Sequence, residues 1–146
     1  MKQSTKKIVA LFLSLISLFI GIFIYSFLRI PPFILNKLYA LTKTQNWVQS
    51  VRTNFTNTEF PEWILYGLPD LLWMFSFMLF ILMIWNFRLN RHSLIWIIGA
   101  ICIGLAYEFF QLTEITPGVF DFKDIGYILT GALLALLFTI KIKRNA

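Results

Sequence analysis

The stretch Ala106–Gly131, AYEFFQLTEITPGVFDFKDIGYILTG, decides the fold because it joins two apolar runs of membrane-spanning length. Glu108 and Gln111 close the first run, and Asp121 and Asp124 open the second after a Pro-Gly turn. An acidic group beside hydrocarbon is costly, so each needs a structural or functional reason to be there. A connection this short predicts two antiparallel membrane helices that are neighbours.

The composition extends this interpretation to the whole chain. Of the 146 residues, 58% are hydrophobic and only 14% are charged, and the mean hydropathy is +0.74. A soluble domain of this size could not bury so much apolar surface, whereas a bilayer solvates it. The net charge of +6 comes from cations that flank the apolar runs. That pattern is typical of topology signals and lipid headgroup contacts, and no nucleic-acid partner is expected.

Four apolar runs predict an all-α integral membrane bundle of four transmembrane helices, in a single domain covering residues 1–146. The expected spans are residues 8–28, 68–85, 94–112 and 125–140. A secretory signal peptide is the alternative for the first run, but the run exceeds a usual apolar core of about 7–15 residues. No small-x-small cleavage site follows it, which favours a retained helix.

The proline and polar residues between the apolar runs predict where the helices begin and end. Pro31-Pro32 cannot continue a helix and should end the first span. Pro69 and Asp70 suit the first turn of the second span, where a missing N–H costs nothing and a negative charge favours the helix dipole. The single Cys102 excludes an intramolecular disulfide and a CxxC metal motif, and its apolar neighbours predict a small packing residue.

The long connection over residues 33–68 allows two readings. Apolar residues recur in it near the helical period, at Ile34, Leu38, Leu41 and Val48. They predict an interfacial amphipathic helix lying on the membrane, and an irregular loop with scattered apolar residues is the alternative.

The distribution of basic residues predicts the orientation. The N-terminus, the turn at Arg88–His92 and the C-terminal tail are short and basic, and four spans place all three on one side. By the positive-inside rule, we expect a multi-pass membrane protein with both termini cytoplasmic. Six polar residues then lie near the outer face: Asp70, Glu108, Gln111, Glu114, Asp121 and Asp124.

Small residues continue two of these polar faces toward the membrane interior. Glu108 and Gln111 share a helix face with Ala100 and Gly104, and Asp124 is followed by Gly131 and Ala135 at helical spacing. Because small residues let membrane helices approach closely, the third and fourth spans are expected to pack with these two stripes facing each other.

Each acidic residue also has a structural explanation. Asp121 fits an N-cap with Asp124 at the third helical position, Asp70 can be a first-turn charge, and Glu114 suits a solvated loop. Glu108 has the weakest local explanation and is therefore the strongest functional candidate.

The candidate catalytic residues are Glu108, Asp124 and Asp121, as general acids or bases. Asp70, Gln111 and Arg29 complete the predicted substrate-binding or polar cluster, where Arg29 can pair with an acid or a lipid phosphate. If a divalent cation is bound through oxygen ligands, we expect Glu108 and Asp124 to hold it. The sequence identifies no cofactor. His92, the single histidine, is expected on the opposite side, so no Ser–His or Cys–His pair can form at the acids.

These motifs resemble the VanZ-like family of small bacterial membrane proteins. The resemblance lies in the order Tyr107-Glu108-Phe109-Phe110-Gln111, Pro117-Gly118, Phe120-Asp121 with Asp124, and Gly131. Asp70 resembles the family's acidic residue at the second span, so about half of the chain is covered. The chain departs from the pattern at Val119, where a basic residue is usual, and at Ile128, where Asn is usual. A family His is also absent near Trp73 and Met74.

The resemblance implies a protein that acts at the cell envelope, in glycopeptide (teicoplanin-type) resistance or in processing of an envelope lipid. Its expected partners are membrane lipids and a lipid-linked or cell-wall component. The alternative is a non-catalytic assembly or accessory subunit whose acids are structural. A proton-coupled transporter is less favoured because such carriers place an essential acid near the bilayer midplane. Enzymatic activity and oligomeric state stay open.

Overall fold

The structure is a computed structural model that describes residues 3–29, 33–116 and 119–144. The described residues contain helices, turns and loops but no strand, so the all-α prediction is confirmed. Pro31-Pro32 and Pro117-Gly118, which were predicted to end the first span and to make the last turn, lie outside these ranges.

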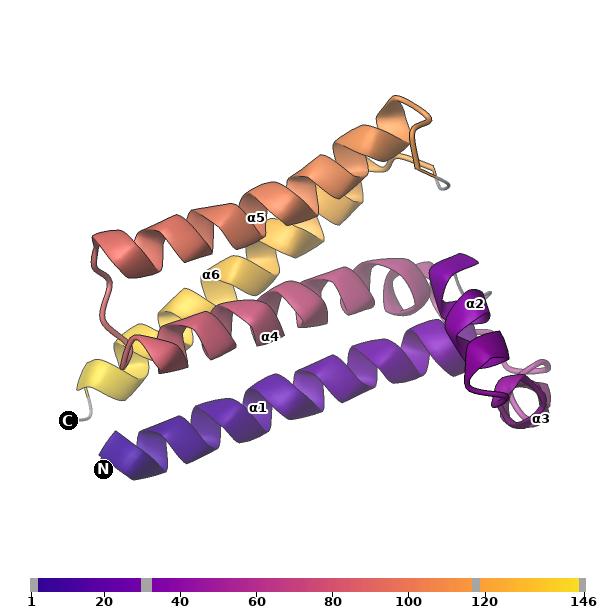
Figure 1. Cartoon of the computed structure of the whole chain (residues 1–146), viewed down its shortest axis with the longest axis horizontal. Helices are drawn as coiled ribbons and strands as arrows, with labels where there is room; N and C mark the ends of the chain where they lie inside the picture. Colours follow the sequence, from indigo (N-terminus) through magenta and orange to yellow (C-terminus); the bar gives the residue numbers. More distant parts are fainter. Residues whose placement is uncertain (1–2, 30–32, 117–118, 145–146) are drawn as a thin grey trace.

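Four long helical stretches form the bundle (Figure 1). They are α1 (Gln3–Phe23) continued by the π-helical turn η1 (Ile24–Leu28), the π-helical turn η2 (Trp63–Gly67) continued by α4 (Leu68–Ile84), α5 (Arg91–Leu112), and α6 (Phe122–Arg144). The candidate membrane spans within them contain 26, 22, 22 and 22 residues. Since 22 residues of α-helix extend about 33 Å, each is long and apolar enough to cross a bilayer. The chain is a multi-pass membrane protein.

The helices extend beyond the predicted runs where polar residues cap them. Helix α5 begins at Arg91, three residues before the predicted span, because Asn90 and Ser93 form a reciprocal capping box. The Asn90 Oδ1 accepts from the Ser93 N–H at 2.8 Å, and the Ser93 Oγ accepts from the Asn90 N–H at 2.9 Å. At α6, the Asp121 Oδ1 accepts from the Lys123 N–H at 2.9 Å, which is the predicted N-cap.

Helix α4 begins at Leu68, with Pro69 at its start and Asp70 in its first turn, as predicted. Helical structure begins five residues before α4, at Trp63, and the π-helical turn η2 runs into α4 without a break. Pro69 cannot donate to a preceding carbonyl, and a widened turn accommodates such a residue within a helical stretch. Asp70 therefore lies in the first turn of α4 and seven residues after the start of the whole helical stretch.

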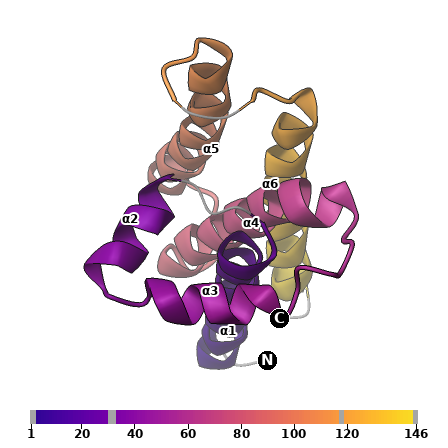
Figure 2. The ribbon, with the colours of Figure 1, turned by 90° about the vertical axis from the view of Figure 1, so that its right-hand side faces the viewer.

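The connection between the first two spans is helical, as the prediction of an amphipathic helix implied, but it forms two helices instead of one. It contains α2 (Phe33–Leu41) and α3 (Gln45–Thr53), separated at Lys43, which has a φ of 57°. A left-handed residue cannot continue a helix, so the chain turns there. Helix α3 lies across the end of the bundle (Figure 2).

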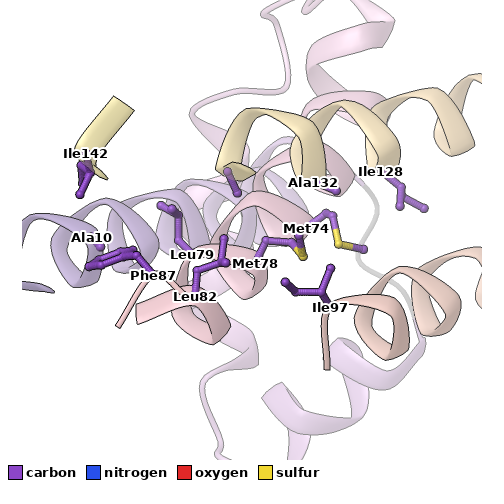
Figure 3. Close-up of a cluster of buried hydrophobic side chains, with 11 residues drawn as sticks. Ala10, Met74, Met78, Leu79, Leu82, Phe87, Ile97, Ile128, Ala132 and Ile142 are labelled. Atoms are coloured by element: carbon purple, nitrogen blue, oxygen red, sulfur yellow. The ribbon is translucent and has the colours of Figure 1, made fainter. Parts of the chain in front are cut away.

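Helix α4 is the centre of the bundle and packs chiefly against α1 and α6. The core is a cluster of apolar side chains around Met74, Met78, Leu79 and Leu82 of α4 (Figure 3). In the same region, Ser14 of α1 and Ser76 of α4 exchange hydrogen bonds of 2.8 and 3.0 Å with each other's backbone carbonyls. Apolar side chains such as Ile8 and Ile103 point outward, as lipid contact requires.

The small residues of the fourth span were predicted to pack against the third span, and for Gly131 this prediction is wrong. A Cβ on Gly131 would lie 2.3 Å from the carbonyl oxygen of Leu71, so this glycine lets α6 approach α4 rather than α5. A Cβ on Gly104 would meet Met74 at 3.0 Å and Ile128 at 3.4 Å, so the α5 stripe faces both α4 and α6. Cys102 was predicted to be a packing residue, but it is exposed on α5, which has few buried positions.

The two ends of the bundle differ in charge. Both termini and the connection between α4 and α5 lie at one end, and the connections between α1 and α4 and between α5 and α6 lie at the other (Figure 1). The terminal end carries Lys6, Lys7, Arg88, Arg91, Lys141 and Lys143. All seven acidic residues of the chain are at the opposite end. We call this opposite end the carboxylate end.

Candidate functional site

Three carboxylates from three helices meet at the carboxylate end. Asp70 comes from α4, Glu108 from α5 and Asp124 from α6, and one oxygen of each lies within 4.8 Å of the others. Glu108 is only 4% exposed, and Asp70 and Asp124 are half-buried. We call Asp70, Glu108 and Asp124 the carboxylate centre. These residues are separated by up to 54 positions in the sequence, so tertiary packing assembles the centre.

Close helix packing brings Asp70 and Asp124 together. Gly131 lies two turns along α6 from Asp124 and rests on the backbone of Leu71, the residue after Asp70. Gly67 is covered by the ring of Tyr127, because a Cβ there would come within 2.0 Å of that ring. Both contacts hold the first turns of α6 against the start of α4.

Glu108 has an unsatisfied oxygen. Its Oε2 is buried and has no hydrogen-bond partner among the described residues. Burying a polar group without a partner costs free energy, more so when the group is charged. No hydrogen bond among the described residues explains the burial of this oxygen, and the functional role of Glu108 stays a prediction.

Asp70 is held by the first span. The hydroxyl of Tyr25 donates a hydrogen bond to the Asp70 Oδ1 at 3.1 Å. The Tyr25 ring in turn packs edge-on against Trp73, with centroids 5.8 Å apart. One carboxylate of the centre is thus oriented by a residue from η1.

Arg29 lies over aromatic rings rather than on a carboxylate. Its guanidinium carbon is 4.5 Å from the centroid of Tyr25 and 4.9 Å from that of Tyr66. It makes no ion pair with any carboxylate of the described residues, but it is near enough to attract Asp70 and Asp124 electrostatically. The structure thus places Arg29 near the acids without an ion pair, and a lipid phosphate as its partner stays a prediction.

The other predicted residues lie around the centre or away from it. Asp121 is exposed and caps α6, Gln111 is half-buried one turn beyond Glu108, and Glu114 is exposed in the loop after α5. His92 is exposed at the terminal end of the bundle. The centre is therefore made of Asp70, Glu108 and Asp124, without Asp121 among the three.

Three aromatic residues beside the centre were not predicted as site residues: Tyr25, Trp73 and Tyr66, the last of which was expected only as an interfacial aromatic. Tyr25 precedes Arg29 by four residues, so helical spacing alone could have placed both on one face of the first span. The hydrogen bond to Asp70 could not be predicted, because it joins residues 45 positions apart. Tyr66 and Trp73 are aromatic residues near a membrane interface, where such residues are common.

The arrangement permits two kinds of chemistry. Carboxylates this close can share or transfer a proton as general acid and base. They can also bind a hard cation through oxygen. The chain was compared with family models, curated proteins and solved structures, and no family model, curated protein or solved structure matches it.

Proposed function

We propose that this chain is a VanZ-like integral membrane protein of the bacterial plasma membrane that acts on a lipid-linked or cell-wall component of the envelope. Its working site is the carboxylate centre, with Arg29 beside it. The observation that supports this proposal is that the buried Glu108 has an oxygen without a hydrogen-bond partner and lies beside two other carboxylates. The family resemblance of the motifs around Glu108 and Asp124 adds the envelope setting and teicoplanin-type resistance.

Arg29 supports an anionic substrate. A guanidinium forms bidentate hydrogen bonds with phosphate, and stacking on Tyr25 and Tyr66 holds its plane in a defined position. Lipid-linked envelope components carry phosphate near the membrane surface, the level expected for the end of η1. The carboxylates then act on the bound headgroup as acid, base or ligands.

Isosteric substitutions test the site. Glu108→Gln and Asp124→Asn keep side-chain size and remove the charge, and Asp121→Asn is the matched control because Asn caps helices as well as Asp does. We expect all three variants to accumulate in the membrane. Teicoplanin susceptibility and envelope lipid composition should change in the first two variants and stay at wild-type values in the third. Wild-type phenotypes for Glu108→Gln and Asp124→Asn would contradict the proposal.

The alternative function, an assembly or accessory subunit, is favoured by a different observation. Asp121 caps α6 and so already has a structural role. If the other acids are also structural, Glu108→Gln and Asp124→Asn should prevent accumulation in the membrane.

The outward orientation is tested by cysteine labelling in a Cys102→Ala background. Val119 is 87% exposed at the carboxylate end, and His92 is exposed at the terminal end. With both termini cytoplasmic, an impermeant thiol reagent added to intact cells labels Val119→Cys and not His92→Cys. The reverse pattern would place the carboxylate centre on the cytoplasmic side. Ser93 is unsuitable for this test because it is fully buried.

A further inference from the structure

We propose that Asp70, Glu108 and Asp124 bind one divalent cation of the oxygen-preferring class, Mg²⁺ or Ca²⁺. The inference names the ligand of the site on which the proposed function rests.

The first argument is the unpartnered oxygen. A cluster of acids at a protein surface needs no ligand, because water solvates it. Glu108, however, is 96% buried, and its Oε2 has no hydrogen-bond partner among the described residues. One oxygen of its carboxylate also lies within 4.8 Å of an oxygen of Asp70 and of an oxygen of Asp124. A bound cation would satisfy this oxygen.

The second argument is geometry. Oxygen ligands on opposite sides of a Ca²⁺ ion are about 4.8 Å apart, and those around Mg²⁺ about 4.2 Å. The three carboxylate oxygens already lie within the diameter of a Ca²⁺ coordination sphere. We expect side-chain rotations to bring them onto one ion.

The third argument is charge. When ionised, the three carboxylates and the nearby Arg29 leave two negative charges at the end of a membrane bundle. No other cation of the described residues forms an ion pair with the centre. One divalent cation balances that charge. Three carboxylates leave coordination positions open, and Mg²⁺ and Ca²⁺ commonly fill such positions with water or a phosphate oxygen.

Direct binding of Mn²⁺, a spectroscopic substitute for the same ligand class, tests the proposal. The full chain is placed in nanodiscs of zwitterionic phosphatidylcholine, so that anionic lipid does not bind the metal. Free Mn²⁺ is then followed by electron paramagnetic resonance. We expect one saturable site per chain, at least about tenfold weaker in Glu108→Gln and Asp124→Asn because affinity follows the number of charged ligands. Competition by Ca²⁺ and by Mg²⁺ separates the two natural ions.

Two further acids at the same end serve as controls. Asp121→Asn and Glu114→Gln remove exposed charges that lie outside the carboxylate centre. Both should bind Mn²⁺ within about twofold of wild type, since neither is a ligand. Equal binding by wild type and Glu108→Gln would overturn the site, as would the absence of saturable binding by wild type.

Thermal unfolding gives an independent readout that also covers variants with altered folding. In EDTA the wild type holds three uncompensated carboxylates, so Glu108→Gln should unfold at the same or a higher temperature. Added Ca²⁺ or Mg²⁺ should raise the wild-type Tm and leave the Tm of Glu108→Gln nearly unchanged. If protons rather than a cation occupy the centre, neither protein responds to the metals, and the proposal fails.

The outcomes separate this proposal from the proposed function. If Glu108→Gln loses the resistance phenotype but the wild type binds no Mn²⁺, the proposed functional site is supported and the proposed cation is rejected. If the variants lose Mn²⁺ binding but keep a wild-type phenotype, the cation site is supported and the proposed function is rejected.

Discussion

At the terminal end of the bundle, buried polar groups have protein partners, whereas at the carboxylate end several have none. Lys6 is 4% exposed, and its Nζ donates to the carbonyl oxygen of Ile142 at 2.9 Å. Ser93 is fully buried and its Oγ donates to the carbonyl oxygen of Arg88 at 2.9 Å. These two buried groups thus each satisfy a backbone carbonyl near a helix end.

The described residues contain three buried side-chain atoms without a partner, and all three belong to the other half of the bundle. They are Trp73 Nε1, Glu108 Oε2 and Thr116 Oγ1. Polar groups in proteins are normally satisfied when buried. This difference between the ends is the one expected if the terminal end serves stability and the carboxylate end binds the proposed cation.

The largest expected effect comes from breaking the packing that assembles the carboxylate end. In Gly131→Ala the new methyl group meets the Leu71 backbone, which cannot move away as a side chain can. We expect a loss of at least about 1–3 kcal/mol, the usual cost of overpacking, and poor accumulation in the membrane. The free energy of unfolding in mixed micelles measures it.

Gly126→Ala is the matched control in the same helix, since nothing lies within 4 Å of a Cβ at that position. Its stability should equal or slightly exceed that of wild type, because Ala favours helix more than Gly does. Equal losses in both variants would mean that glycine flexibility, and not the α4–α6 contact, matters at Gly131.

The next effect concerns the terminal end. Lys6→Met keeps most of the side-chain volume but leaves the Ile142 carbonyl without its donor. A hydrogen bond to a charged group contributes about 1.5–3 kcal/mol, so the free energy of unfolding should fall by an amount in this range. Lys7→Met, at a half-buried neighbour, should change it little. A stabilised Lys6→Met would contradict the view that the terminal end is built for stability.

A smaller loss is expected at the start of α5. Asn90→Ala removes the capping box with Ser93 and should cost about 0.5–2 kcal/mol, measured by thermal unfolding. Asn90→Asp restores an oxygen acceptor and should recover most of the loss. An Asn90→Asp variant as unstable as Asn90→Ala would show that the cap is not what stabilises this end.

The smallest effect lies between the two ends. Ser76→Ala removes the donor to the Ser14 carbonyl and the hydroxyl contact, while Ser14 can still donate to residue 76. Hydrogen bonds between membrane helices contribute about 0.6 kcal/mol on average, and the loss in unfolding free energy should be of that size. Ser17→Ala, also buried in α1 but without such a bond, should lose less.

Several features could be predicted from the sequence because they depend on neighbouring residues. Hydropathy located all four spans, since a bilayer leaves a helix as the way to satisfy the backbone of an apolar run of this length. Asp121 was correctly predicted to cap α6, because a cap needs only the residues two or three positions ahead. Glu108 was singled out by the same local reasoning, because no neighbour in sequence accounts for an acid at the end of an apolar run, and its functional role stays a prediction.

Only the tertiary structure decided which helices pair. A glycine stripe predicts close approach but carries no information about its partner, so Gly131 was assigned to α5 and packs on α4. The exposure of Cys102 could not be predicted either, because it depends on how α5 is oriented in the bundle. The bond from Tyr25 to Asp70 and the meeting of Asp70, Glu108 and Asp124 depend on contacts between distant segments. Such contacts follow from how all four helices fill space together, which no local pattern encodes.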